Sequence, residues 1–310
     1  MKRWLVLALL LGASGAVMYY AQLHKTETRV GPEAVLNSLA DAQRDVSRVP
    51  ARIVRLSDDE EVTLGDAMAA RYMRAVNLSP LDQRIADYVG DIGETVAGRA
   101  RRKLHYQFHY VPDPGLVNAF ALPGGHVFIG KGLFQLMETE DELASVLGHE
   151  VEHVDNYHCN DRVSLEARLR GLPLSELVTL PVELFQAGYS KEQELEADRD
   201  GTSLAVMSGY SPHGAIRLFQ TFARLEQRYA NKAQTPDEEI SRTVLEGIAG
   251  YFRSHPLAAE REAQIRQIIA SRNWTQPPER ELRVQPEPAP RNPLPRISAD
   301  YRGFGRARSY

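Results

Sequence analysis

One five-residue stretch constrains the fold of this chain most: His149-Glu150-Val151-Glu152-His153. The surrounding residues, Leu143 to Val154, have the pattern of apolar side chains that predicts a buried helix. Residues four apart lie on one face of a helix, so both imidazoles can reach one Zn²⁺ at about 2.0–2.1 Å. Glu150 would then lie beside the metal, where its carboxylate can take a proton from metal-bound water. The alternative is a surface helix with two solvated histidines.

A second predicted helix offers the third protein ligand that a zinc hydrolase needs. It runs from Ser190 as N-cap toward Met207 and is acidic in its first turns. Glu194 and Asp198 share one face, whereas Glu196 lies about 200° from Glu194, so only one of the two glutamates can point at the metal. We expect Glu194 to be the ligand and Asp198 to accept a hydrogen bond from a ligand imidazole. The alternative is a solvated acidic face.

These motifs resemble those of the zinc peptidases that include the CAAX prenyl endopeptidases, the heat-shock membrane protease and the mitochondrial Oma-type proteases. The closest resemblance is to their periplasmic, BepA-like members. Besides the two motifs above, the resemblance rests on residues 118–129, on residues 140–148, and on Ser254-His255-Pro256 with Arg261, and it covers roughly Leu81 to Ile269. It implies an α+β fold: a mostly helical gluzincin-type metallopeptidase domain with a small three-stranded sheet beside the H-E-x-x-H helix.

The resemblance also implies roles for the site residues. His149, His153 and Glu194 would hold one Zn²⁺ per subunit, and Glu150 would act as general base on zinc-bound water. His255 is the candidate donor to the developing oxyanion, or it could occupy the open coordination position and hold the enzyme latent. From its sequence position alone, without the resemblance, the preferred interpretation of His255 is a residue at the entry of a helix before Pro256.

A protease often binds an extended peptide as one more strand on a sheet edge. The resemblance implies that residues 118–125 provide this edge near the zinc, so the candidate substrate-binding residues are Asn118, Ala119, Phe120, Gly124 and Gly125. The two glycines would allow close approach of a substrate backbone. The alternative is a plain hairpin turn.

The N-terminus carries a possible membrane signal. Lys2 and Arg3 precede an apolar run from Trp4 to about Tyr20, which is close to the length of a membrane span. We expect residues 1–25 to form an uncleaved anchor, with a cleaved signal as the alternative. The positive charges would remain in the cytoplasm, so the catalytic domain would lie at the periplasmic face of the bacterial inner membrane, or be free in the periplasm after cleavage.

The remaining chain divides by composition. A length of 310 residues with 43% hydrophobic residues suits one catalytic domain with extensions. We expect a linker with a short helix over 26–63, the peptidase domain over 64–272, and a disordered Pro/Arg-rich tail over 273–310. The pattern predicts helices over 64–77, 81–100, 161–170, 174–187, 212–230 and 256–270, and strands over 105–111, 117–121 and 126–129.

The predicted function is zinc-dependent endopeptidase activity on misfolded or unassembled envelope proteins. A net charge of −4 indicates no nucleic-acid partner. The alternative is a periplasmic chaperone or assembly factor with a latent or structural zinc site. Four protein ligands would favour that alternative, whereas three ligands and a water favour catalysis.

Overall fold

The computed structural model describes residues 55–230, 255, 258–272, 274 and 277–284. The expected membrane anchor, most of the expected linker and the end of the tail lie outside the described residues. Within the described ranges, no helix is both long and apolar enough to cross a membrane.

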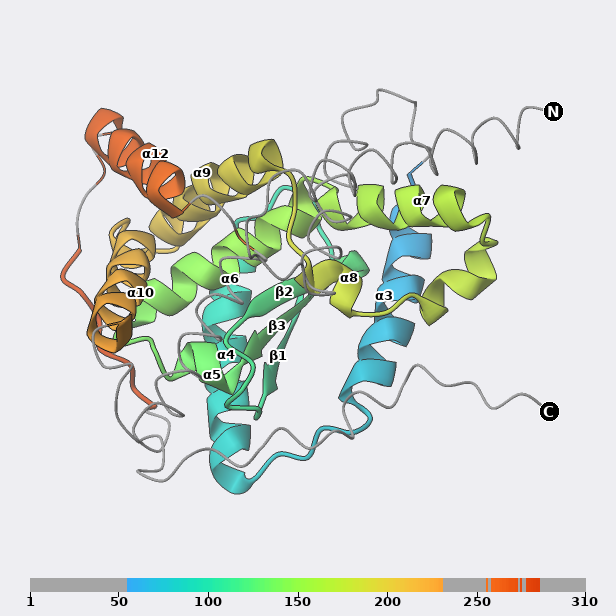
Figure 1. Cartoon of the computed structure of the whole chain (residues 1–310), viewed down its shortest axis with the longest axis horizontal. Helices are drawn as coiled ribbons and strands as arrows, with labels where there is room; N and C mark the ends of the chain where they lie inside the picture. The colour runs from blue at the N-terminus through green and yellow to red at the C-terminus, as the bar shows by residue number, and fades with distance from the viewer. Residues whose placement is uncertain (1–54, 231–254, 256–257, 273, 275–276, 285–310) are drawn as a thin grey trace, which may run out of the picture. The chain divides into compact units, whose positions relative to one another are not determined.

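Helices make up most of the described structure, and three short strands form one sheet (Figure 1). In chain order the elements are α3 (Asp58–Met73), α4 (Pro80–Ala97), β1 (Gln107–Val111), β2 (Ala119–Leu122), the 3₁₀ turn η1 (Pro123–Gly125), β3 (His126–Gly130), α5 (Lys131–Phe134), α6 (Glu140–Asp155), α7 (His158–Arg170), the 3₁₀ helix η2 (Leu174–Thr179), α8 (Glu183–Gln186), α9 (Lys191–Met207), α10 (Gly214–Ala230) and α12 (Ala258–Ser271). The expected fold class, mostly helical with a small three-stranded sheet, is confirmed.

The sheet has the order β1-β3-β2, with β3 parallel to β1 and antiparallel to β2. Phe120 of β2 pairs with Phe128 of β3, and their rings stack with centroids 4.9 Å apart. The 3₁₀ turn η1 connects these two strands through Gly124 and Gly125, whose φ angles of 78° and 102° are readily adopted only by glycine. The tight turn holds β2 against β3, and the strand order places β2 at an edge of the sheet.

Helix α6 is the centre of the helical part. It packs against α4, α9, α10 and β2, and every one of its residues is buried. Its start is fixed by Thr139, whose hydroxyl accepts a hydrogen bond from the backbone N–H of Glu142, while the Glu142 carboxylate accepts one from the N–H of Thr139. A capping box of this kind is worth roughly 1 kcal/mol. The cap and the surrounding helices hold α6 in one position.

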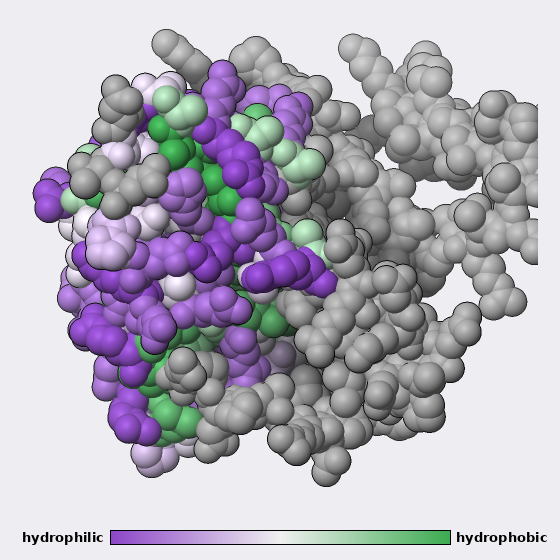
Figure 2. All heavy atoms as spheres, turned by 90° about the vertical axis from the view of Figure 1, so that its left-hand side faces the viewer, coloured by the Kyte–Doolittle hydropathy of each residue, from purple (hydrophilic) through white to green (hydrophobic). Residues whose placement is uncertain are grey.

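The side of the molecule that carries α10 and α12 is mainly hydrophilic (Figure 2). Apolar residues appear there only in strips between polar ones, as expected where amphipathic helices pack on each other. Ile216 and Phe219 of α10 and Ile265 of α12 are buried together in a small cluster apart from the main core. This cluster joins α12 to the rest of the helical part.

Two sequence expectations need correction. Residues 174–187 do not form one helix, because Pro181 lacks an N–H and disfavours helical backbone at Leu180, which has ψ 137°. The result is η2 followed by the short α8.

The second correction concerns residues 277–284, which lie in the stretch expected to be disordered. Glu281 forms an antiparallel bridge with Thr139, and the Arg280 N–H donates to the Asp141 carboxylate at 3.0 Å. Leu282 is buried in the main core. Specific backbone pairing with the start of α6 orders this segment although its composition is typical of disorder.

Candidate metal centre

The H-E-x-x-H helix, α6, crosses α9 at a pair of glycines, where the two backbones are in contact. A Cβ built on Gly148 of α6 would lie 2.7 Å from the carbonyl oxygen of Gly201 in α9, and one on Gly201 would lie 2.7 Å from the carbonyl carbon of Gly148. Any larger residue at either position would push the helices apart. This close crossing brings the first turns of α9 within reach of the imidazoles on α6.

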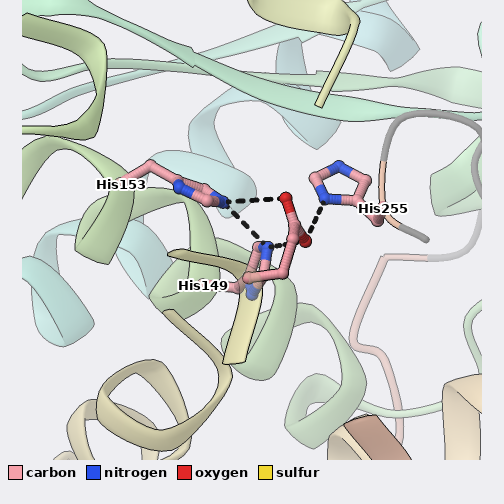
Figure 3. Close-up of side chains that lie close together, drawn as sticks. His149, His153 and His255 are labelled. Carbon is pink, nitrogen blue, oxygen red and sulfur yellow. Dashed lines mark hydrogen bonds and ion pairs between the residues drawn. The ribbon is translucent and has the colours of Figure 1, made fainter. Parts of the chain in front are cut away.

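Glu194 of α9 reaches both imidazoles of α6 (Figure 3). Its Oε2 lies 3.4 Å from His149 Nε2 and its Oε1 lies 3.7 Å from His153 Nε2, while the two Nε2 atoms are 3.1 Å apart. The Glu194 side chain and the His153 side chain are fully buried. The expected ligand set is therefore brought together by the fold.

The outer nitrogen of His149 shows that this cluster suits a cation. His149 Nδ1 lies 2.9 Å from the Asp198 carboxylate, so Nδ1 carries a hydrogen and Nε2 faces inward. Burial alone would lower the pKa of His149, but the Asp198 and Glu194 carboxylates outweigh it and raise that pKa to about 9, so a positive charge is favoured here. Burial lowers the pKa of His153 well below its ordinary value, so this imidazole is neutral and has one nitrogen lone pair to offer a cation. The positive charge that the buried Glu194 carboxylate favours can be a proton on His149 Nε2, or a metal ion that displaces this proton and binds the inward nitrogens. The donor set of two imidazoles and one carboxylate fits zinc.

The position of His255 brings a fourth donor to the cluster. Its Nδ1 lies 3.0 Å from Glu194 Oε2 (Figure 3). Its Nε2 lies 3.7 Å from Glu150 Oε1. His149, His153, Glu194 and His255 offer ligand atoms that all lie within 4.8 Å of one another. The geometry thus places His255 close enough for either of its two expected roles.

Arg261 of α12 neutralises the carboxylates around the cluster. Its Nε and Nη2 donate to the two oxygens of Asp198 at 2.6 and 2.7 Å, and its Nη1 lies 3.4 Å from Glu194 Oε2. Burial alone would raise the pKa of Asp198, but the Arg261 guanidinium outweighs it and lowers that pKa. Despite burial, His255 and then the same Arg261 guanidinium hold the pKa of Glu194 well below its ordinary value. Both carboxylates are therefore ionised at neutral pH.

Glu150 has an oxygen with no partner among the described residues. Only 1% of Glu150 is exposed, and its Oε2 makes no hydrogen bond. Burial raises the pKa of this carboxyl group, which makes its carboxylate a stronger base than an exposed glutamate. A buried, basic carboxylate with a free oxygen can take a proton from a water that enters the site.

The chain matches one family model over more than half of its length. Residues 83–269 match the model of peptidase family M48. The chain belongs to peptidase family M48. The resemblance seen in the motifs is confirmed.

Several curated proteins resemble this M48 chain. It is 28% identical to a beta-barrel assembly-enhancing protease of Yersinia pestis over 235 residues, which are 67% of this chain and 47% of that protein. It is 27% identical to the metalloprotease LoiP of Escherichia coli over 70% of this chain and 83% of LoiP, and 26% identical to the metalloprotease YcaL over 86% and 97%. The match therefore spans less than half of the length of the Yersinia pestis protein.

The expected substrate-binding residues lie at the sheet edge beside α6, but the edge is covered. Ala119 and Phe120 of β2 are 0% and 1% exposed, and Asn118 just before them is 8% exposed. The carbonyl oxygen of Ala119 lies 3.5 Å from His255 Nε2, which ties the outer side of β2 to the metal cluster.

The two glycines lie close to the backbone of other parts of the chain. A Cβ on Gly124 would lie 2.7 Å from Val62 Cα and 2.8 Å from the carbonyl oxygen of Glu61, both in α3. A Cβ on Gly125 would lie 3.3 Å from the carbonyl oxygen of His105. A backbone does approach Gly124 closely, but it is that of α3, so this glycine serves packing within the M48 domain.

Sequence reasoning missed two neighbours of His153. Tyr189 stacks on its ring at 4.0 Å between centroids and donates its backbone N–H to Glu194, and His158 contacts His153 Nδ1 at 3.0 Å. His158 in turn contacts Glu196 at 3.3 Å. A histidine five residues after the motif was a visible signal for His158, whereas no pattern in the sequence marks Tyr189.

Proposed function

We propose that this chain is a zinc-dependent endopeptidase. The observation that carries the proposal is the free, buried oxygen of Glu150 beside the convergent His149, His153 and Glu194. These three residues would hold the metal. When bound, zinc supplies a Lewis acid that lowers the pKa of water and polarises a carbonyl group.

The chain's own residues would then move the protons. Glu150 takes a proton from the attacking water and passes it to the nitrogen of the leaving amine. Asp198 keeps the hydrogen of His149 on Nδ1, and Arg261 balances the charge of Asp198 and Glu194. The buried surroundings exclude bulk water, which strengthens each of these interactions.

The proposed substrates are unfolded or unassembled proteins of the bacterial envelope. The name of the Yersinia pestis relative, a beta-barrel assembly-enhancing protease, supports this class. Residues 1–25 would anchor the chain at the periplasmic face of the inner membrane. Substrate would pair with the outer side of β2 at Ala119 and Phe120, where its scissile bond can reach Glu150. Because Ala119 is buried and its carbonyl oxygen contacts His255, the His255 side chain must move aside for this pairing.

The two roles of His255 make opposite predictions. As donor to the oxyanion, it would accelerate cleavage, so His255→Ala would lower the rate. As a fourth ligand, it would hold the enzyme latent, so the same variant would raise the rate. An unchanged rate would remove His255 from both roles.

The test of the proposed function compares wild type with Glu150→Gln in the purified full chain. We expect both proteins to bind one zinc, and only the wild type to degrade casein. Glu152→Gln is the matched control, because Glu152 is a buried glutamate of the same helix that faces Arg101 and Asn156. Cleavage by Glu150→Gln at the wild-type rate would contradict the assignment of the general base.

One observation favours a second candidate, an assembly factor with a structural metal. The cluster offers four protein donors, as structural zinc sites do. If wild type and His255→Ala both bind zinc and neither cleaves casein, this second function is favoured.

A further inference from the structure

The metal centre has an outer chain of hydrogen bonds on the side of His153 that faces away from the other ligands. His153 Nδ1 lies 3.0 Å from His158 Nδ1, and His158 Nε2 lies 3.3 Å from the Glu196 carboxylate. The His158 side chain is only 4% exposed, whereas 42% of the Glu196 side chain is exposed. The chain therefore runs from the buried ligand to the surface of α9.

The chemistry of Glu196 fixes the direction of each hydrogen bond. A carboxylate only accepts, so the hydrogen of His158 must be on Nε2. The Nδ1 atom of His158 then carries a lone pair, which accepts the hydrogen from His153 Nδ1. His153 is left with a lone pair on Nε2, the atom that lies 3.1 Å from His149 Nε2 and 3.7 Å from Glu194.

A single unusual turn places His158. Tyr157, between α6 and α7, has a φ angle of 64°, and no other non-glycine residue in the described ranges has a positive φ. Such a backbone costs roughly 1–2 kcal/mol for a residue with a side chain, so surrounding contacts must hold it. The guanidinium groups of Arg55 and Arg102 lie over the Tyr157 ring at 4.5 and 4.1 Å. The turn starts α7 at His158, directly beside His153.

Helix α9 reaches both nitrogens of His153. Glu194 approaches Nε2 directly, and Glu196, on another face of the same helix, approaches Nδ1 through His158. Residues of α9 thus contact His153 from two sides, directly through Glu194 and indirectly through Glu196 and His158. Tyr189 packs flat on the His153 ring and prevents it from tilting.

We propose that His158, oriented by Glu196, positions His153 as a metal ligand and thereby strengthens zinc binding. The inference rests on the proposed metal site and assigns a role to two residues outside it. His158 fixes which nitrogen of His153 carries the hydrogen and fixes the plane of the ring. Outer partners of this kind typically change metal affinity roughly 10- to 100-fold.

The experiment measures the dissociation constant for Zn²⁺ in the full chain by competition with a chromogenic chelator. His158→Leu removes the acceptor, and we expect zinc affinity to fall roughly 10- to 100-fold. His158→Asn keeps a side-chain oxygen near the position of Nδ1, so we expect it to recover most of the affinity, to within roughly threefold of wild type. Glu196→Ala should weaken zinc binding less than His158→Leu, because Glu196 is partly exposed and water can replace it.

The control is His126→Leu. His126 is another buried histidine, and it lies between a second histidine and a carboxylate, with His109 at 3.0 Å and Asp66 at 2.9 Å, but it contacts none of the four clustered residues in the described structure. We expect its zinc affinity to equal that of wild type. Far-ultraviolet circular dichroism of each metal-free variant shows whether it remains folded.

Three results would overturn the inference. The first is wild-type affinity in His158→Leu, and the second is equal weakening in His158→Leu and His126→Leu, which would indicate a general loss of packing. The third is an affinity in His158→Asn as low as in His158→Leu. None of these concerns cleavage: the proposed function fails instead if wild type binds no zinc.

Discussion

Two chains of hydrogen bonds in this molecule have the same chemical make-up. One joins Glu196, His158 and His153 in the helical part at distances of 3.3 and 3.0 Å. The other joins Asp66, His126 and His109 across α3 and the sheet at 2.9 and 3.0 Å. Each begins at a partly exposed carboxylate, with 42% and 56% of its side chain exposed, and passes through a histidine that is 4% exposed.

The two chains differ in what lies at the inner end. The ring of His153 faces His149, Glu194 and His255, which come from α6, α9 and the segment before α12. The ring of His109 instead stacks on Phe128 with centroids 4.5 Å apart. The chain that ends at His153 therefore ends among candidate metal ligands from several elements, whereas the chain that ends at His109 ends on an apolar ring.

The comparison shows that a histidine held by a carboxylate does not by itself make a site. What matters is convergence: lone pairs from separate elements must meet where water is excluded. In the helical part the close crossing at Gly148 and Gly201 provides this convergence. On the sheet, the register of β1 and β3 pairs His109 with Phe128, so the His109 ring packs on an apolar side chain and, among the described residues, belongs to no cluster of candidate metal ligands.

The largest difference in effect is expected when the inner histidine of each hydrogen-bond chain, His153 or His109, is replaced. His153→Leu should lower zinc affinity by at least about a hundredfold and abolish casein cleavage, because a direct ligand contributes more than an outer partner. His109→Leu should leave both unchanged. Zinc content after dialysis against a weak chelator measures the first quantity. Loss of zinc in His109→Leu would show that the hydrogen-bond chain of Asp66, His126 and His109 also supports metal binding.

Much of the site follows from the sequence because helix geometry is local. The four-residue spacing of His149 and His153, and of Glu194 and Asp198, predicts which side chains share a face. The 200° separation of Glu196 from Glu194 also correctly predicts that the two point in different directions; Glu196 turns to His158. The roles of these residues remain predictions until the metal and the rate are measured.

The other features of the site and the fold depend on contacts between residues far apart in the sequence, which local sequence patterns do not predict. His158 reaches His153 only because Tyr157 adopts a positive φ, which no propensity predicts for tyrosine. Gly148 and Gly201 look like ordinary helix glycines until the two backbones are seen to touch. Residues 277–284 have the composition of a disordered tail, yet they pair with the start of α6. Tertiary packing decides each of these cases.

Arg261 supplies the positive charge beside the two buried carboxylates of the metal cluster. Arg261→Leu leaves Asp198 and Glu194 buried without their guanidinium partner, so we expect the free energy of unfolding to fall by about 3 kcal/mol or more. Arg261→Lys keeps the charge but not the paired hydrogen bonds, and it should recover part of the loss. Urea denaturation of the metal-free proteins measures both. A loss below about 1 kcal/mol in Arg261→Leu would show that water or another group replaces the guanidinium.

The hydrogen-bond chain of Asp66, His126 and His109 should instead make the free energy of unfolding depend on pH. Burial, and then the neighbouring His126, lowers the pKa of His109 from 6.5 to about 4. Between these two pKa values the unfolded protein binds more protons than the folded protein. The contribution of neutral His109 to the free energy of unfolding is therefore fully present above pH 6.5 and is lost as the pH falls toward 4. We expect His109 to account for a loss of roughly 1–3 kcal/mol over this range.

The measurement is the free energy of unfolding at several pH values in wild type and in His109→Phe. The phenylalanine keeps a ring against Phe128 but does not titrate, so its curve should be flatter between pH 6.5 and 4. Parallel curves for the two proteins would assign the pH dependence to other groups.

The smallest effect is expected at the carboxylate end of the sheet chain. Burial lowers the pKa of His126, so at pH 7 the contact with Asp66 joins a neutral imidazole to a half-exposed carboxylate. Asp66→Asn keeps an oxygen that accepts the same hydrogen bond and should change the free energy of unfolding by about 0.5 kcal/mol or less. Glu196→Gln should have an equally small effect on unfolding of the metal-free protein, since its carboxylate is also partly exposed. If the two chains differ only in what their inner histidines hold, these two variants will be alike in stability, and only Glu196→Gln will alter zinc affinity. A stability loss in Asp66→Asn of several kcal/mol would instead mean that the carboxylate anchors the sheet itself.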